Sequence, residues 1–215
     1  MSNTSNPRPT PRTEPRFAAL VLAAGGSSRL GRPKQLLPYK NGVLLDAVLD
    51  VARACPFAQR VLALGGSADQ VQEAVDTTGF DVVINDEYTT GCSSSIAAAI
   101  GSVRDDVDGI MLLLGDQPEV QPATIAAVLA RRGSAPIAVT RYDDGIGHPF
   151  ALSRATFPAL LALHGDRGVW KLIDRLGTAV ARVRVEGRVP RDVDTDEDYR
   201  ALLAGTASSA AAESA

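Results

Sequence analysis

The chain has 215 residues, a formal net charge of −3 and only two cysteines. This length predicts one α/β domain with a core that needs no disulfide or metal, and the small net charge disfavours binding to nucleic acid or to an anionic membrane. Cys55 and Cys92 lie far apart in the sequence, which excludes a disulfide framework and a zinc motif. Because the sequence has no apolar signal segment and no apolar run of membrane-spanning length, we expect a cytoplasmic protein.

The two ends of the chain differ in composition from its middle. Residues 1–15 and 206–215 have compositions typical of disorder, which predicts tails on either side of a single domain at 16–205. Within that domain we expect strands at Phe17–Ala24, Arg60–Leu64, Phe80–Ile84, Gly109–Leu114, Pro136–Arg141 and Ala179–Val185. Helices are expected at Leu44–Ala54, Ala68–Val75, Ser94–Val103, Pro122–Arg131, Ala155–Leu163, Val169–Leu176 and Asp196–Leu203. This alternation predicts a Rossmann-like, doubly wound α/β fold, with a mostly parallel sheet and helices on both faces.

A glycine-rich basic segment follows the first expected strand. It reads Leu22-Ala-Ala-Gly-Gly-Ser-Ser-Arg-Leu-Gly-Arg-Pro-Lys34. Glycines let the backbone approach a ligand closely, and successive N–H groups form a nest for phosphate oxygens, to which Arg29 and Lys34 add positive charge. The glycine spacing matches neither the Walker loop nor the Gly-x-Gly-x-x-Gly loop. The segment therefore predicts a phosphate-binding loop, and its spacing weakens the case for a simple ATPase or a dehydrogenase.

Two polar segments lie in the middle of the chain. Gly91-Cys-Ser-Ser-Ser-Ile96 opens an expected helix, so its hydroxyl and N–H groups either contact a nucleotide or simply cap the helix. Asp116 directly follows a buried strand, at the sheet edge where the glycine-rich segment also opens. It either caps a turn or holds Mg²⁺, which takes one or two protein carboxylates and completes its shell with water and phosphate.

Three further segments in the last third of the chain are candidates for a site. His148 lies in Gly145-Ile-Gly-His-Pro-Phe150, and without a partner carboxylate or nucleophile in the sequence it is either a site residue or a hydrogen-bonded loop histidine. His164-Gly-Asp-Arg-Gly168 either closes over a ligand or forms a turn between helices. Arg191-Asp-Val-Asp-Thr-Asp-Glu-Asp-Tyr199 either starts the last helix or supplies a second carboxylate to a metal.

The glycine-rich segment carries a family resemblance. Its pattern, Leu-Ala-Ala-Gly-x-Ser-x-Arg-x-Gly-x-x-Lys, resembles the signature of the MobA-like nucleotidyltransferases, and the resemblance extends from Ala18 to about Leu203. It implies a fold of the nucleotide-diphospho-sugar transferase type and an Mg²⁺-dependent transfer of a nucleotide to a phosphorylated acceptor. Alignment of that phosphate, which is largely a dianion at neutral pH, and neutralisation of charge would suffice without a strong base or a covalent nucleophile. Cys92 is accordingly interpreted as a packing residue.

Four short segments are most similar to the cytidylyl branch of that family, and in particular to the molybdenum cofactor cytidylyltransferases (MocA). They are Leu22-Ala-Ala-Gly25, Gly42-Val-Leu-Leu-Asp46, Gly115-Asp-Gln-Pro118 and Gly147-His-Pro149. The similarity implies CTP rather than GTP as the nucleotide and molybdopterin carrying molybdenum as the acceptor. The products would be the cytosine dinucleotide cofactor and pyrophosphate, and a molybdoenzyme or its chaperone would be a partner.

The resemblance also implies roles for single residues. Arg29, Lys34 and Asp116 would be catalytic, and Asp116 and Asp194 would bind the metal. Asp196 stands where the family has a proline, so Asp192 and Asp196 remain open as metal ligands beside Asp194. The acceptor would contact Gln117, His148 and Asp166. The nucleotide would contact Leu22, Ala23, Ala24, Gly25, Gly26, Ser27, Ser28, Arg29, Lys34, Gly65, Ser94 and Asp116.

Further functions remain open at the level of the sequence. A guanylyltransferase, or a cytidylyltransferase that acts on a sugar or polyol phosphate, would use the same loop. A non-catalytic nucleotide-binding protein or an accessory protein of an oxidoreductase would keep the fold without the turnover.

Overall fold

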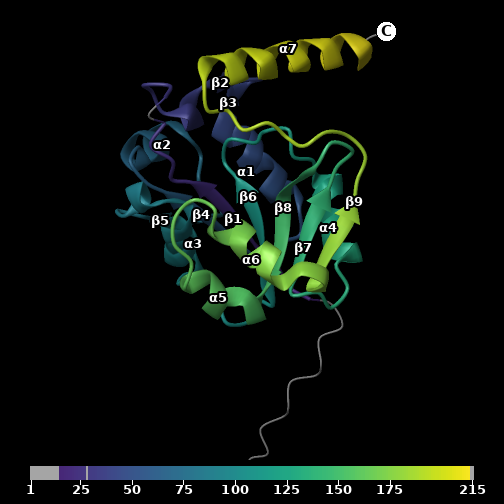
Figure 1. Cartoon of the computed structure of the whole chain (residues 1–215). Coiled ribbons are helices and arrows are strands. Elements are labelled where there is room, and N and C mark those ends of the chain that lie inside the picture. Colours follow the sequence, from purple (N-terminus) through teal and green to yellow (C-terminus); the bar gives the residue numbers. More distant parts are fainter. Residues whose placement is uncertain (1–14, 28, 214–215) are drawn as a thin grey trace, which may run out of the picture.

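A seven-stranded sheet forms the centre of the computed structural model, which describes residues 15–27 and 29–213 (Figure 1). The strand order is β5-β4-β1-β6-β8-β7-β9. All neighbouring strands pair in parallel except β8, which is antiparallel to both β6 and β7. The strands are β1 (Phe17–Ala23), β4 (Gln59–Leu64), β5 (Asp81–Ile84), β6 (Gly109–Leu114), β7 (Ile137–Arg141), β8 (Ile146–Ser153) and β9 (Val180–Arg184). The predicted α/β class and the mostly parallel sheet are therefore confirmed.

Apolar side chains alternate between the two faces of the central strand β1, and each face has its own core. Ala19 and Val21 pack with α1 (Leu44–Ala54), α2 (Ala68–Ala74) and α4 (Pro122–Arg131). Ala18 and Leu20 pack with α3 (Cys92–Ile100), α5 (Phe157–Leu161) and α6 (Gly168–Leu176). Because both faces are covered by helices (Figure 1), the inner strands are apolar along almost their whole length.

Two features differ from the sequence-based expectation. Strand β8 was not predicted, because its first residues, Ile146-Gly-His-Pro149, carry the glycine and proline that are typical of a loop. The last helix, α7, was expected to end at Leu203, but it extends over Asp196–Glu213 and takes in most of the segment for which disorder was predicted. Its second half is rich in alanine, the residue with the highest helix propensity.

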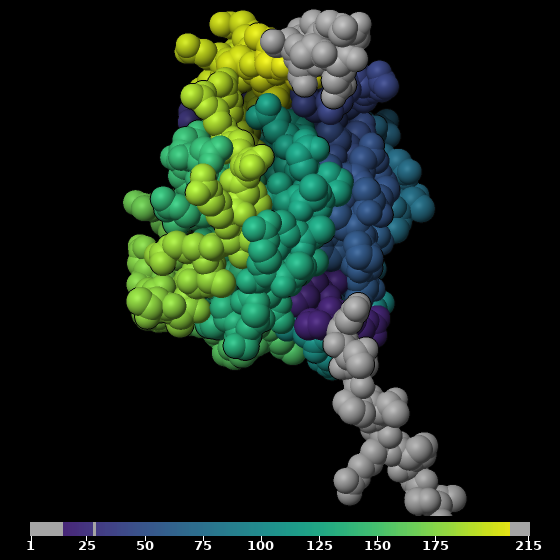
Figure 2. All heavy atoms as spheres, turned by 90° about the vertical axis from the view of Figure 1, so that its right-hand side faces the viewer, coloured from purple at the N-terminus to yellow at the C-terminus, as the bar shows by residue number. Residues whose placement is uncertain are grey.

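A third, smaller core joins the C-terminal segment to the residues that follow the glycine-rich loop. It contains Leu30, Leu37, Tyr39, Leu44, Val193 and Leu202. Around it lie η1 (Lys34–Leu36) and the hairpin of β2 (Pro38–Tyr39) and β3 (Gly42–Val43). The chain from β9 onward climbs one side of the molecule to α7 (Figure 2), where the Tyr199 hydroxyl donates to the Pro38 carbonyl at 2.5 Å. The acidic cluster of residues 192–198 is thereby held beside the glycine-rich loop.

No helix in the described ranges, 15–27 and 29–213, has both the length and the apolar composition that crossing a membrane requires.

Candidate functional site

The main cleft opens at the carboxyl ends of β1 and β6, where ligands bind in open parallel sheets. Its volume is about 640 Å³. Most of the residues that the sequence assigned to the nucleotide and the metal line it: Leu22, Ala23, Ala24, Gly25, Gly26, Ser27, Arg29, Lys34, Asp116 and Asp194. Ser28, also assigned to the nucleotide, lies outside the described residues. The cleft is further lined by Gln35, Tyr88, Thr89, Gly91, Cys92, Ser95, Leu114, Gly115 and Asp166.

Side-chain hydrogen bonds from η1 fix the glycine-rich loop. The Gln35 side-chain amide donates to the carbonyls of Ala23 (2.6 Å) and Gly25 (3.2 Å), and the Lys34 backbone N–H donates to Ser27 Oγ (2.9 Å). Ser27 has a positive φ of 49°, a conformation that costs a non-glycine residue energy and needs such support. Sequence reasoning missed Gln35, because its burial is set by the fold and no local pattern of residues indicates it.

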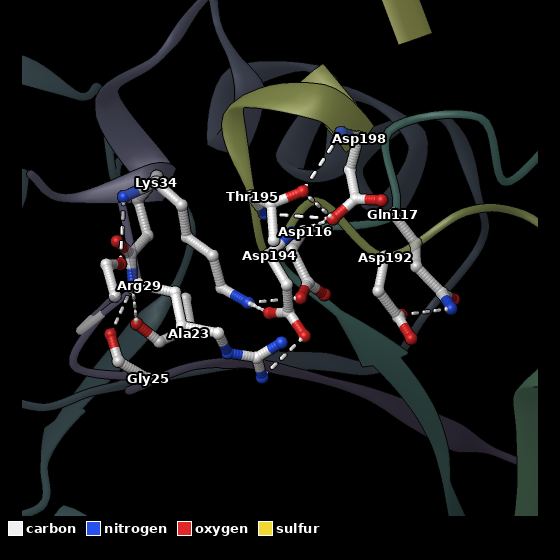
Figure 3. Close-up of polar contacts among 12 residues, drawn as sticks. Ala23, Gly25, Arg29, Lys34, Asp116, Gln117, Asp192, Asp194, Thr195 and Asp198 are labelled. Carbon is white, nitrogen blue, oxygen red and sulfur yellow. Dashed lines mark hydrogen bonds and ion pairs between the residues drawn. The ribbon is translucent and has the colours of Figure 1, made fainter. Parts of the chain in front are cut away.

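Four charged side chains from three parts of the chain meet in this cleft: Arg29, Lys34, Asp116 and Asp194 (Figure 3). The Lys34 ammonium lies 2.5 Å from Asp116 Oδ2 and 2.8 Å from Asp194 Oδ1, and Arg29 Nη2 lies 3.1 Å from Asp194 Oδ2. Burial of Lys34 opposes its charge, but Asp116 and Asp194 outweigh that cost, so the pKa of Lys34 is raised. Burial acts against the charge of Asp194 as well, yet its bond to Lys34 and the charges of Lys34 and Arg29 lower the pKa of that carboxyl. Lys34 and Asp194 are therefore both charged at neutral pH.

The acidic residues that the sequence left open as metal ligands have different partners in the structure. Asp192 accepts from the Gln117 side-chain amide at 2.7 Å, whereas Asp196 pairs with Arg32 at 2.8 Å near the surface. Asp198 accepts from the backbone N–H and the hydroxyl of Thr195 and so caps the start of α7. Among the acidic residues of this cluster, only Asp194 bonds to Lys34 beside Asp116.

The carboxylates of Asp116 and Asp194 fit a divalent metal. Their oxygens lie on either side of one positive charge, the Lys34 ammonium, so together they already hold a cation. Two hard carboxylate donors that leave room for water and phosphate are the usual protein contribution to an Mg²⁺ site.

Two of the residues assigned to the nucleotide do not line the cleft. A Cβ on Gly65 would lie 2.5 Å from the Ala24 carbonyl oxygen, so this glycine allows the ends of β1 and β4 to pack closely. The Ser94 hydroxyl lies within hydrogen-bond distance of the carbonyls of Glu87 (3.0 Å) and Gly91 (2.8 Å), so its one proton is bound within the protein. Ser95 lines the cleft in its place.

The amino terminus of α3 is also occupied. The N–H of Cys92 donates to Asp166 Oδ1 at 3.0 Å, and the N–H of Ser93 donates to the Gly165 carbonyl at 3.2 Å. The segment at 164–168 therefore closes on α3, and these N–H groups are not open to phosphate as the sequence had suggested.

A second pocket of about 270 Å³ adjoins the main cleft. Cys92, Leu114 and Asp166 line both cavities. All three residues that the sequence assigned to the acceptor line the second pocket: Gln117, His148 and Asp166. Trp170 and Asp192 line it too; sequence reasoning gave Trp170 no role and considered Asp192 only as a metal ligand.

His148 is held among aromatic rings in this pocket. Its ring stacks on Phe150 with centroids 4.1 Å apart, and Trp170 lies edge-on to it at 6.5 Å. Burial lowers the pKa of His148 from 6.5 to about 3, so the imidazole is neutral at physiological pH. A neutral histidine fits a role in shaping the pocket rather than in supplying charge.

This lowered pKa predicts how stability depends on pH. Because the unfolded chain binds a proton that folded His148 does not, stability should fall as the pH drops below about 6.5, by at most about 1.4 kcal/mol per pH unit. His148→Gln should remove this slope between about pH 6.5 and 5, as measured by urea unfolding. His164→Gln, which changes the chain's other histidine, serves as the control and should retain it. An unchanged slope in His148→Gln would contradict the neutral state of the folded imidazole.

Cys92 is predicted to be unreactive although it borders both cavities. Burial, together with the charges of Asp166 and Asp116, raises the pKa of the thiol to about 11, so the nucleophilic thiolate is scarce at neutral pH. We expect slow alkylation by iodoacetamide at about pH 7.5 and a change of less than about twofold in turnover for Cys92→Ser. Rapid alkylation of the folded protein at Cys92, detected by mass spectrometry, would contradict this assignment.

Comparisons with known proteins identify the family of this chain. A family model described as "MobA-like NTP transferase domain" matches residues 19–180. The structure of Rv0371c from Mycobacterium tuberculosis H37Rv is 48% identical, with a TM-score of 0.83 over 89% of this chain and 99% of that one. A structure of Rv0371c in complex with manganese is 46% identical, with a TM-score of 0.79 over 87% and 98% of the two chains.

Two relatives with different names are similar over nearly their whole length. Molybdenum cofactor cytidylyltransferase of Escherichia coli is 27% identical over 185 residues, 84% of this chain and 92% of that protein. Nicotine blue oxidoreductase of Paenarthrobacter nicotinovorans is 26% identical over 199 residues, 88% of this chain and 97% of that protein. The family match covers most of the sheet and the glycine-rich loop with Lys34 and Asp116. This chain is therefore a member of the MobA-like NTP transferase family.

Proposed function

We propose that the protein transfers CMP from CTP to the phosphate of molybdopterin that carries molybdenum, with release of pyrophosphate. The observation that carries the proposal is the position of Lys34 between Asp116 and Asp194, in a cleft lined by the glycine-rich loop. The MobA-like family membership supports nucleotide transfer, and the similarity to a molybdenum cofactor cytidylyltransferase supports the choice of nucleotide and acceptor.

The cleft would receive the triphosphate. N–H groups of the glycine-rich loop would bind its oxygens, and Arg29 and Lys34 would neutralise the charge that develops on the departing pyrophosphate. Asp116 and Asp194 would hold a divalent metal, Mg²⁺ or Mn²⁺; Mn²⁺ is supported by the manganese complex of Rv0371c. A bound metal of this kind polarises phosphate oxygens.

The second pocket would hold the acceptor. Its shared wall with the cleft would bring the acceptor phosphate to the α-phosphorus of the nucleotide, so positioning would supply much of the rate. The attacking phosphate is largely ionised at neutral pH and needs no strong base. A neutral His148 and a protonated Cys92 are compatible with this chemistry.

Pyrophosphate release tests the proposal directly. The protein would be incubated with Mg²⁺ or Mn²⁺ and with CTP or GTP, each with and without purified molybdenum-loaded molybdopterin. We expect release from CTP that depends on the acceptor and is lost in Asp116→Asn. Release from GTP alone would assign the protein to the guanylyl branch.

Two control reactions distinguish transfer to molybdopterin from transfer to a different acceptor and from binding without catalysis. Release with a polyol phosphate such as 2-C-methylerythritol 4-phosphate, but not with molybdopterin, would show that the acceptor is a polyol phosphate. Nucleotide binding without release under any of these conditions would indicate a non-catalytic binding protein and contradict the proposal.

A further inference from the structure

One buried polar atom in the second pocket has no partner. The Gln117 side chain is 3% exposed, and its amide nitrogen donates to Asp192 Oδ1 at 2.7 Å and to the Pro190 carbonyl at 3.3 Å. Because both partners only accept hydrogen bonds, the nitrogen must face them, and the orientation of the amide is fixed (Figure 3). Gln117 Oε1 is then left without a hydrogen bond among the described residues. A buried acceptor of this kind is costly unless a ligand or a water molecule supplies a donor.

The charges of the pocket favour a ligand that donates hydrogen bonds. The charged side chains that line it are Asp166 and Asp192, and no lysine or arginine of the described chain lines it. A phosphate group would be repelled here, whereas the adjoining cleft carries Arg29 and Lys34. The organic part of an acceptor, rather than its phosphate, therefore matches this pocket.

The apolar part of the pocket favours a flat ring. Trp170 and His148 line it. Phe150 contacts both rings, with its centroid 4.1 Å from that of His148 and 5.2 Å from that of Trp170. Aromatic rings held at fixed angles offer a rigid surface on which a planar ligand can stack.

We propose that the second pocket recognises the acceptor through a planar nitrogen heterocycle with N–H donors along one edge. Gln117 Oε1 and the Asp192 carboxylate accept from that edge and determine specificity, and Trp170 provides the stacking surface. This proposal rests on the proposed function for the assignment of the pocket to the acceptor. Because Cys92, Leu114 and Asp166 line both cavities, a ring bound here would place its phosphate-bearing side chain beside the cleft that contains Lys34.

Binding of free heterocycles, without nucleotide or metal, tests the proposal. The probes are pterin, which carries an amino donor, lumazine, which has a carbonyl oxygen in the place of that amino group, and erythritol 4-phosphate as a polyol phosphate. Trp170 is the only tryptophan of the chain, so its fluorescence reports occupation of the pocket, and calorimetry gives the affinity. We expect pterin to bind about tenfold more tightly than lumazine and to quench Trp170.

Two variants test the assigned residues. Gln117→Met removes the orphaned oxygen, and Asp192→Asn keeps the shape of the side chain but removes its charge. Each should weaken pterin binding about tenfold and reduce the preference over lumazine. Gln72→Met, on the exposed side of α2, is the matched control and should change nothing. Thermal unfolding and the emission of Trp170 in the free protein establish that each variant is folded.

Several results would overturn the proposal. They are no pterin binding at millimolar concentration, equal affinity for pterin and lumazine, tighter binding of the polyol phosphate, or pterin binding that neither folded variant weakens. The proposed function is tested separately. Pterin binding with the expected pattern, but without release of pyrophosphate, would support the recognition site and contradict the proposed cytidylyl transfer.

Discussion

Replacing Lys34 with methionine is expected to lower turnover on the order of 10³-fold while the protein stays folded. The ammonium is the positive charge that Asp116 and Asp194 share, and its side chain is only 14% exposed. Methionine keeps the aliphatic packing but removes the charge from the point where the charge of the leaving pyrophosphate would gather. Pyrophosphate release at saturating CTP measures the loss, and circular dichroism and thermal unfolding establish the fold.

The same variant should affect metal binding in the opposite direction. In the free protein the ammonium occupies the carboxylate oxygens that a metal would use, so its removal should tighten binding of Mn²⁺ about tenfold in the absence of nucleotide. Electron paramagnetic resonance of free Mn²⁺ measures this affinity. Lys171→Met, on an exposed position of α6, is the control and should match the wild type in both assays. Near-normal turnover in Lys34→Met would contradict a catalytic role for Lys34.

Asp116→Asn is expected to lower turnover by a similar factor, on the order of 10³, and to abolish Mn²⁺ binding. Asparagine has the size of aspartate but lacks its charge and is a weaker ligand for a hard cation. The Asp116 side chain is 14% exposed, so little water is available to replace the lost interaction. Asp194→Asn should be milder, about 10- to 100-fold, because the Asp194 side chain is 37% exposed.

Asp196→Asn is the matched control for this pair of carboxylates. Asp196 lies two residues from Asp194 but pairs with Arg32 at the surface, and exposed pairs contribute little to stability. We expect turnover and Mn²⁺ affinity within about twofold of the wild type. If Asp196→Asn lost as much activity as Asp194→Asn, the assignment of the second metal ligand to Asp194 would be wrong.

The glycine-rich loop and Asp116 lie at one edge of the sheet, a placement that follows from contiguous residues. The segment from Leu22 to Lys34 lines the cleft because a buried strand must deliver the residues that follow it to the edge of the sheet. Asp116 reaches the same edge for the same reason, since β6 pairs in parallel with β1. Apolar periodicity and strand order are enough to predict such placements.

Local contacts set the positions of two residues and one strand that differ from the sequence-based expectation. The family resemblance implied nucleotide contacts for Ser94 and Gly65, but neither lines the cleft: the Ser94 hydroxyl contacts carbonyls near its own helix, and Gly65 relieves a steric conflict with Ala24. Strand β8 resembled a loop because pairing with β6 and β7, rather than its own residues, makes it a strand.

The α/β fold and the place of the glycine-rich loop at the edge of the sheet follow from patterns within short segments of the sequence. The tertiary structure alone decided which carboxylate meets Lys34, 160 positions away in the chain. Val193 is fully buried in the small core with Leu37 and Leu202, which anchors this extended segment and lets its neighbours Asp192 and Asp194 reach Gln117 and Lys34. Asp196 already belongs to α7 and faces Arg32. Packing of an apolar side chain between two similar carboxylates is a long-range property, and no local pattern encodes it.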